Sequence, residues 1–559
     1  MSDGSMSTEG GTPGAGVSLS ERGDQLAFIR QSTGLVRLMG ARQAMVYNAM
    51  ITGVIVISGL TFIWVPYAFP GANIWLSFLI SGLFAAPMIA AYSLLAVSMP
   101  RSGGDYLFQS RLLHPAIACA LCLSGYVIWM AFWENLDGYF FSDYALSPVS
   151  AMVGTQEHAH WLISFSTWAT TPWGLTVVSL VAFIPILALL IRGARLYLRI
   201  QPVLWFLTVL SFVVCWILLL SHGHSSFVSS FNAYVDRTSG VKGYYAKILA
   251  AAHKAGFQRT GMNIGDTFGA VAIIWTGIAW TMWSVVNAGE VKSAVRLRSV
   301  SLSMQGALGL NVVLLTITGV LFVHTVGLTF LQAVGYLFFV SPGGLSALPT
   351  IPFFGLITSV LSHSLIVLLL IGLGFVANGI QILFGVAWGG SRLILAMAFD
   401  RLLPERLGDV NPRTHTPVKA LLFFFGMGTA WVLLYNHTVV AKYTLAVTLA
   451  SIFVYLGTMC AAMVFPYRAP ELFKRSPVAR LKLLGIPLIT AMGALGFILN
   501  AWIAYYYFAD DKLFVNDTKS MVLVFGLVAI CGVYYYIRRW WLNQQGYEPD
   551  VAYKMIPPE

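Results

Sequence analysis

The chain has 559 residues, of which 58% are hydrophobic and only 10% are charged. A soluble protein of this length needs about a quarter of its residues charged to cover its surface. The composition therefore excludes a soluble protein and predicts an all-α polytopic membrane protein. The net charge of +11 does not indicate a nucleic-acid partner, because the positive residues fall between long apolar stretches.

Twelve apolar stretches are long enough to cross a bilayer as helices. Residues 1–25 precede them and are rich in Gly, Ser, Thr and Pro, so we expect a disordered tail there rather than a signal peptide. Residues 327–352 read as an apolar loop packed against the outer mouth, and 385–400 as an interfacial helix. The predicted spans are 44–66, 73–99, 116–141, 174–191, 202–221, 267–289, 300–324, 353–384, 420–436, 443–466, 484–508 and 520–537.

Lysines and arginines divide unequally between the two sides of the predicted membrane. Of the 33 basic residues, 25 fall on the side that carries both termini and eight fall on the other side. Cytoplasmic connections of membrane proteins carry the excess of Lys and Arg. We therefore expect a multi-pass protein of the plasma membrane with both termini in the cytoplasm.

The cysteines all lie within apolar stretches and predict neither disulfides nor a zinc site. Cys119 and Cys122 have the form CxxC, but their place inside a span favours buried, unreactive side chains. We expect no metal, no cofactor and no catalytic residue.

The sixth predicted span contains small and polar residues near its middle, where a simple membrane anchor has no use for them. These are Thr276, Gly277 and Ala279, and the neighbouring tryptophans are Trp275, Trp280 and Trp283. We predict that this helix is broken at mid-membrane and binds a solute there. The alternatives are that the glycine only allows close helix packing and that the tryptophans form an interfacial belt, although two of them lie too deep for that.

The third predicted span carries two acids beside two tryptophans on one broad helical face: Trp129, Trp133, Glu134 and Asp137. A carboxylate inside a membrane span is costly and indicates a function by default. Glu134 and Asp137 are candidates for proton coupling or for attracting a cationic solute. The alternative is that each acid forms an ion pair with Lys or Arg of residues 222–263. For Glu134 this alternative and a functional role weigh equally, and for Asp137 the ion pair is favoured.

Three segments resemble motifs of the amino acid–polyamine–organocation transporter family. Residues 99–106 (MPRSGGDY) resemble its P-x-x-G-G-x-Y motif, and 289–292 (GEVK) resemble its E-V-K-N-P motif, with Ser293 and Ala294 replacing Asn-Pro. Residues 391–404, followed by a Thr-Pro pair, resemble its S-R-x-x-x-A-M-A-x-D-G-x-L-P motif, with Arg where Gly is usual. The resemblance covers about residues 35–470.

This resemblance implies the LeuT-type fold, in which spans one to five repeat as spans six to ten with inverted topology and the first helix of each repeat is interrupted. Exposed amides at the interruptions bind the charged ends of the substrate. In span six the interruption is expected at Ile278–Trp280. In span one the candidates are Thr52-Gly53 and Ser58-Gly59. The implied domains are a core at 26–470 with repeats at about 44–221 and 267–466, helices eleven and twelve at 471–541, and a C-terminal tail at 542–559.

The implied function is secondary active transport of an amino acid or related organic amine by alternating access. Residues 365–390 contain no Ser or Thr, and Asn378 and Gln381 are their only polar side chains. Sodium coupling needs oxygen ligands in this span. It is therefore disfavoured, unless Ser359, Ser362 and Ser364 supply those ligands. Proton coupling through Glu134 or His363, and exchange without an ion, remain open. The alternatives are a polyamine or cationic-amine transporter and a solute sensor that does not transport.

Charged residues on the basic side form a candidate inner gate. An ion-paired set is expected among Glu290, Lys292, Arg296, Arg392 and Asp400. The alternative is that these residues only set topology and solvate the loops. Glu290 stands out as an acid beside a basic loop.

Overall fold

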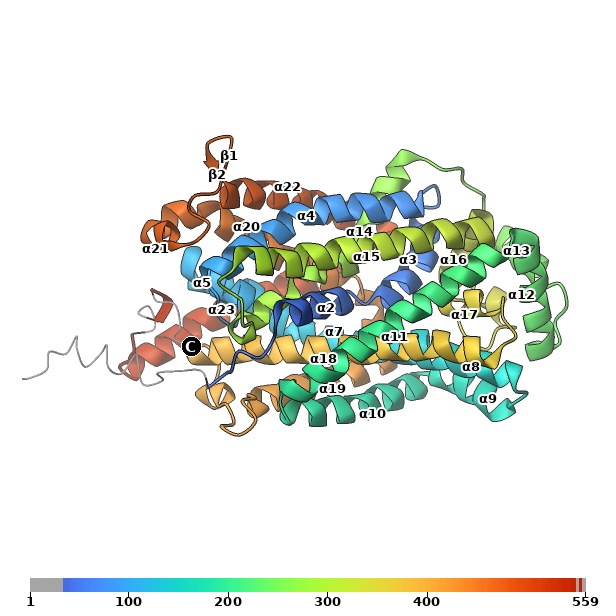
Figure 1. Ribbon diagram of the computed structural model, residues 1–559, viewed down its shortest axis with the longest axis horizontal. Helices are drawn as coiled ribbons and strands as arrows, with labels where there is room; N and C mark the ends of the chain where they lie inside the picture. The colour runs from blue at the N-terminus through green and yellow to red at the C-terminus, as the bar shows by residue number, and fades with distance from the viewer. Residues whose placement is uncertain (1–33, 549–551, 555–559) are drawn as a thin grey trace, which may run out of the picture.

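The computed structural model describes residues 34–548 and 552–554, so the predicted tail 1–25 lies outside the described residues. Twelve described helices are long and apolar enough to cross a membrane, which confirms the all-α polytopic fold (Figure 1). They are α2 with α3 (Ala41–Ile51, Val54–Ala68), α4 (Ile74–Ser98), α6 to α8 (Pro115–Gln156), α10 (Pro172–Ile191), α11 (Ala194–Ser221), α14 with η3 (Ile264–Ile278, Ala279–Glu290), α15 (Leu297–Val326), α18 (Leu365–Phe399), α19 (Val418–His437), α20 (Ala446–Arg468), α22 (Leu488–Ala509) and α23 (Thr518–Gln544).

Shorter helices connect these spans, including the stretch 222–263 that the sequence shows only as a long loop. They are α5 (Gly104–Leu112), α9 (His160–Ala169), α12 (His224–Ser239), α13 (Tyr244–Lys254), α16 (Leu328–Val340), η4 (Pro342–Leu345), α17 (Phe354–Ser359), η5 (Glu405–Gly408), η6 (Val439–Tyr443), α21 (Pro470–Arg475) and η7 (Asp511–Leu513). A two-residue hairpin, β1 (Lys482–Leu483) and β2 (Ile486–Pro487), turns through Leu484 and Gly485. Both turn residues have positive φ, as a type I′ turn requires.

Three predicted boundaries were wrong. The eighth span begins at Leu365 rather than 353, because α17 is a separate short helix. Residues 385–399 continue α18 instead of forming an interfacial helix, because Trp388, Arg392 and their neighbours are buried inside the protein. The apolar loop contains α16, which packs against α3.

The third span is longer than predicted and contains two π-helical segments. Helix α7 (Trp129–Phe140) is preceded by the π-helical segment η1 (Cys119–Ile128) and followed by η2 (Phe141–Leu146). The short α6 (Pro115–Ala118) and α8 (Ser147–Gln156) complete the span. Runs of π-helix are rare and occur often at functional sites, and here two of them flank α7.

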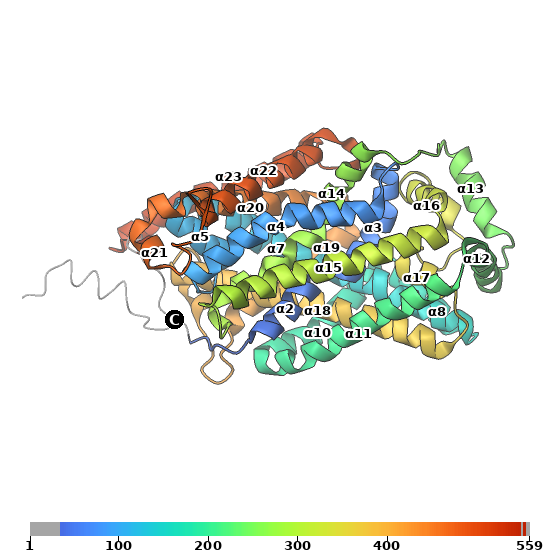
Figure 2. The same ribbon diagram turned by 45° about the horizontal axis from the view of Figure 1, so that its top comes forward.

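The first and sixth spans form the centre of the bundle. Their most apolar stretches are 94% and 100% buried, against 22% for α23. Figure 2 shows α22 and α23 along one edge of the bundle and α10 and α11 along the opposite edge. The two central spans approach closely at Gly277, where an added Cβ would lie 2.0 Å from Ile57 Cδ1. The Thr52 carbonyl oxygen would lie 2.9 Å from the same Cβ, so a larger residue would force a shift in the backbone at this crossing.

Candidate functional site

The first span is interrupted at Thr52 and Gly53. Helix α2 ends at Ile51, Gly53 adopts a left-handed conformation (φ 63°, ψ 60°), and α3 starts at Val54. The first N–H groups of a helix have no intrahelical partner. Asn378 Oδ1 of α18 accepts one of them, from Ile55 at 3.2 Å. The interruption thus directs a helix N-terminus, with its partial positive charge, into the centre of the protein.

The sixth span changes its helical type where the sequence predicted a break. Helix α14 ends at Ile278, and a 3₁₀-helix, η3, runs from Ala279 to Glu290. Trp280 Nε1 donates a hydrogen bond to the Thr276 carbonyl at 2.8 Å. The chain leaves helical geometry only further on, at Asn287 (φ −104°, ψ 21°). The weak point is therefore a change of helical type rather than an extended segment.

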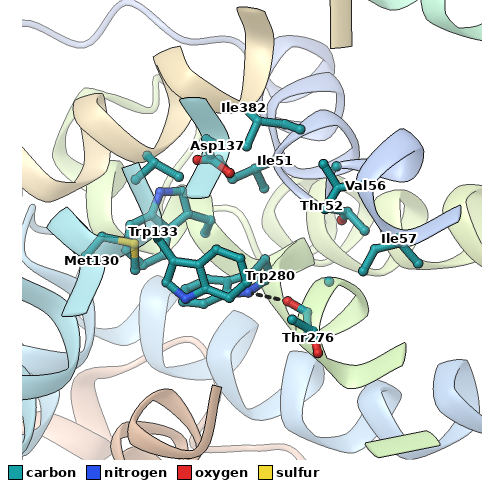
Figure 3. Close-up of a pocket in the computed structure, with 14 residues that line it drawn as sticks. Ile51, Thr52, Val56, Ile57, Met130, Trp133, Asp137, Thr276, Trp280 and Ile382 are labelled. Atoms are coloured by element: carbon teal, nitrogen blue, oxygen red, sulfur yellow. Dashed lines mark hydrogen bonds between the residues drawn. The ribbon is translucent and has the colours of Figure 1, made fainter. Parts of the chain in front are cut away.

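A small cavity of about 30 Å³ lies between these two helix changes and α7. Figure 3 shows its α7 residues on one side and those of the first span on the other, with Trp280 and Thr276 closing it below. The lining residues are Ile51, Thr52, Gly53, Val56, Ile57, Met130, Trp133, Asp137, Thr276, Gly277, Trp280, Trp283, Ile382 and Val386. The cavity is thus largely apolar, with few polar groups to orient a ligand, as small-molecule sites usually are.

Aromatic rings separate the cavity from the basic end of the bundle, the end that holds α5 and the start of α11. Trp280 packs edge-on against Trp133 at 6.0 Å and against Trp283 at 5.2 Å between ring centroids. Tyr126 and Tyr455 complete the cluster around Trp280. These rings offer apolar and π surface to a ligand side chain.

The two acids of α7 occupy different places. Asp137 lines the cavity, is 3% exposed, and its Oδ2 has no hydrogen-bond partner among the described residues. Glu134 is fully buried and faces Gly428 of α19, and neither of its oxygens has a partner in the described chain. No ion pair joins either acid to a described Lys or Arg. The pairing with residues 222–263, favoured for Asp137, was therefore wrong.

Six of the predicted binding residues line the cavity, and six do not. Ser58 and Gly59 lie within α3, where Ser58 Oγ donates to the Val54 carbonyl and Gly59 packs against the Tyr144 ring. Trp129 stacks on Trp431 instead. Trp275, Ile278 and Ala279 are buried elsewhere, because the helix turns these side chains away from the cavity.

A polar network that the sequence did not single out ties the central helices together. Asn48 of α2 accepts a hydrogen bond from the Ser284 amide at 2.8 Å and donates to Ser284 Oγ at 3.0 Å. Asn287 donates to the Tyr47 hydroxyl, which donates to the Gly385 carbonyl of α18. The signal available was the presence of asparagines within apolar helices. The network holds η3 against α2 on the basic side of the cavity.

The basic end of the bundle is closed by two buried ion pairs. Arg392 Nε lies 2.6 Å from Glu290 Oε1, and both side chains are almost fully buried. Arg111 of α5 donates to Asp400 through its two terminal guanidinium nitrogens, at 2.5 and 2.8 Å. The three family-like motifs meet here, since Tyr106 also donates to Asp400. Lys292 and Arg296, by contrast, are exposed.

The first motif packs onto the end of the sixth span through its glycines. Gly103 has φ 116° and donates its N–H to the Val286 carbonyl at 2.9 Å. A Cβ at Gly103 would lie 2.7 Å from Ala396 Cβ of α18. The glycine is required by both the backbone conformation and the close approach.

Asp105 follows these glycines and is a buried acid that sequence reasoning overlooked. Its Oδ1 accepts hydrogen bonds from Tyr92 and Thr458, each at 2.5 Å, and its Oδ2 has no partner in the described chain. Burial raises the pKa of Asp105 from its ordinary value of 3.8 to about 6.

The remaining coupling candidates have structural roles or lie at the surface. Asn378 caps the helix interruption, and Gln381 donates to the Tyr197 hydroxyl. His363 is exposed, and its Nδ1 lies 3.4 Å from a guanidinium nitrogen of Arg237. Ser359 donates to the Leu356 carbonyl in α17, outside the eighth span.

A bundle of twelve described helices that can span a membrane, whose interrupted central helix faces a cavity, has the architecture of a transporter. Residues 43–531 match the protein family described as amino acid permease. The match covers most of the 559 residues, so the chain belongs to this family. It is an integral membrane protein that transports amino acids. Comparison with curated protein sequences yields no match.

Proposed function

We propose that this permease moves its amino acid by alternating access, with the cavity between α3, α7 and η3 as the substrate site. The observation that carries the proposal is that a helix N-terminus, a change of helical type and an unpaired acid meet at one cavity. The fold is expected to consist of two inverted five-helix repeats whose first helices are α2–α3 and α14–η3. The protein is expected in the plasma membrane with cytoplasmic termini.

The substrate carboxylate is expected at the N-terminus of α3. The amides of Val54 and Val56 lie within the first turn, and a helix N-terminus favours an anion. Asp137 lies across the cavity and suits the substrate's ammonium group. The substrate's side chain would then contact Trp133 and Trp280.

Glu134 is the proposed proton carrier. A fully buried carboxyl without a partner is too costly to keep charged in a membrane. Because Glu134 lies one helical turn from Asp137, a charge on Glu134 acts by Coulomb repulsion on Asp137 at the cavity. Proton-coupled uptake is therefore the preferred mechanism, and exchange is the alternative.

A cationic amine is the second candidate substrate class. It is favoured by Asp137, because a single acid in an otherwise apolar cavity selects for positive charge. Neutral amino acids and diamines therefore belong in the same assay.

The test is uptake of radiolabelled amino acids and amines into proteoliposomes. Separate arms impose a pH gradient, a sodium gradient, or counter-substrate inside. Uptake that follows the pH gradient, and that becomes independent of it in Glu134→Gln, supports the proposal. Uptake driven by sodium would overturn proton coupling. A ligand that raises the thermal midpoint without being transported would favour a sensor.

A further inference from the structure

A second, larger cavity lies away from the substrate site, between α10, α11 and α18. Its volume is about 620 Å³. It is bounded by Val177 and Leu189 of α10, Ile200 of α11 and Phe384 of α18, and by Trp168 of α9 at the far end. All its lining residues are hydrophobic. An apolar cavity of this kind does not hold water.

The cavity belongs to the lipid-facing edge of the bundle. The most apolar stretches of α10 and α11 are only 44% and 28% buried. Val177 and Val181, which line the cavity, are 42% and 58% exposed. Figure 1 shows the two helices diverging from the turn that joins them. The space is therefore accessible from the bilayer.

The dimensions suit one lipid chain. Val177 and Leu189 lie twelve residues apart on α10, which corresponds to about 18 Å along the helix. Half the hydrocarbon thickness of a bilayer is about 15 Å. A chain from the leaflet on the basic side would fill the cavity along its length.

Three arginines stand at the basic end of this cavity. Arg192 follows Leu189 by three residues, Arg199 immediately precedes Ile200, and Arg195 lies between them on α11. All three are exposed, and none forms an ion pair with a described residue. Guanidinium groups bind phosphate well because of their planar, multiple donors.

We propose that α10, α11 and α18 form a binding site for an anionic diacyl phospholipid. One acyl chain lies in the apolar cavity, and the phosphate contacts Arg192, Arg195 and Arg199. A zwitterionic lipid offers the same chain and phosphate, but its own cation offsets the charge. The site therefore prefers the anionic head group.

The test is native mass spectrometry of the delipidated full chain in detergent. The probes are phosphatidylglycerol and phosphatidylcholine with identical palmitoyl and oleoyl chains. We expect phosphatidylglycerol to bind at least tenfold more tightly. Because each basic residue near a membrane surface contributes about fivefold, the triple variant R192Q/R195Q/R199Q should lose that preference. The matched control R468Q/R475Q/R480Q removes three exposed arginines of the basic side elsewhere and should keep it.

The acyl-chain part of the proposal has its own variant. Ala182→Phe places a ring in the cavity and should weaken both lipids at least fivefold, whereas Ala188→Phe, on an exposed position of the same helix outside the lining, should weaken neither. Thermal midpoints in phosphatidylcholine verify folding. The proposal is overturned if the arginine triple keeps the preference, if both triples lose it equally, or if Ala182→Phe binds normally. Displacement of phosphatidylglycerol by glycerol phosphate would also overturn the proposal, because the site would then bind a phosphate group without needing an acyl chain.

Discussion

Two acids that lie three residues apart on one helix are expected to have separate tasks. Asp137 contacts the cavity, while Glu134 faces α19 through Gly428. A one-turn spacing places them near each other, but their neighbours differ. Their substitutions should therefore have different kinetic signatures.

Asp137→Asn is expected to raise KM for uptake about 10-fold to 100-fold. A hydrogen bond to a charged group contributes about 1.5–3 kcal/mol, and the substitution removes the charge from the site. Initial-rate uptake over a range of substrate concentrations measures this. Glu134→Gln is the matched comparison, expected to leave KM within about threefold while abolishing the response to a pH gradient. Equal KM changes in both variants would contradict the assignment.

Asp105 should make stability depend on pH. Its pKa is raised in the folded protein, to about 6 from 3.8, so the folded state binds the proton more tightly than the unfolded state. The contribution of Asp105 to stability is therefore greatest at low pH and declines as pH rises from about 4 to 6. The difference corresponds to roughly 3 kcal/mol.

The measurement is the thermal midpoint in detergent between pH 4.5 and 7.5. Asp105→Asn keeps an acceptor for Tyr92 and Thr458 but cannot titrate, so its midpoint should lack this decline. Asp409→Asn, at an acid whose side chain is 47% exposed and pairs with Lys419, should follow the parent protein. An unchanged decline in Asp105→Asn would assign the effect to another group.

At the scale of elements, the interruption of the first span depends on one glycine. Gly53 has φ 63°, and a Cβ there would lie 2.9 Å from Ile382 Cδ1. A non-glycine residue in this conformation costs about 1–2 kcal/mol. The same residue lines the cavity, so stability and binding are coupled at this position.

Gly53→Ala should lower the unfolding free energy by about 1–2 kcal/mol and weaken substrate binding at least threefold. Thermal unfolding with and without substrate measures both effects. Gly309→Ala is the control, since its added Cβ would meet nothing within 4 Å in α15. It should be neutral or slightly stabilising. A Gly53→Ala protein with normal stability and binding would show that the left-handed conformation is dispensable.

At the scale of the whole molecule, the Glu290–Arg392 pair joins the end of the sixth span to α18. The Glu290 carbonyl also accepts hydrogen bonds from the amides of Leu38 and Met39, before the first span. Three distant segments thus meet at one buried pair. If this end opens during transport, the pair must separate.

Glu290→Gln or Arg392→Gln alone is expected to cost about 3–5 kcal/mol of stability, because each leaves an uncompensated buried charge. The double variant should cost less than the two single losses combined, with a coupling energy of about 2 kcal/mol. Urea or thermal unfolding in detergent supplies the double-mutant cycle. The exposed pair Lys419–Asp409 is the control and should couple by less than about 1 kcal/mol. Additive losses at Glu290 and Arg392 would show that the two charges act independently.

The sequence by itself determined the number and order of the spans, because a run of about 20 apolar residues must leave water wherever it lies in the fold. It also indicated the family through three motifs and located the weak point of the sixth span to within a residue. These are local properties of the chain. Tertiary structure decided which side chains share the cavity, because helix rotation and the π-helical segments around α7 set the direction of each residue. It separated Asp137 from Glu134, selected Thr52-Gly53 over Ser58-Gly59, and joined residues 385–399 to α18. Such outcomes depend on contacts between residues hundreds of positions apart, which no local pattern encodes.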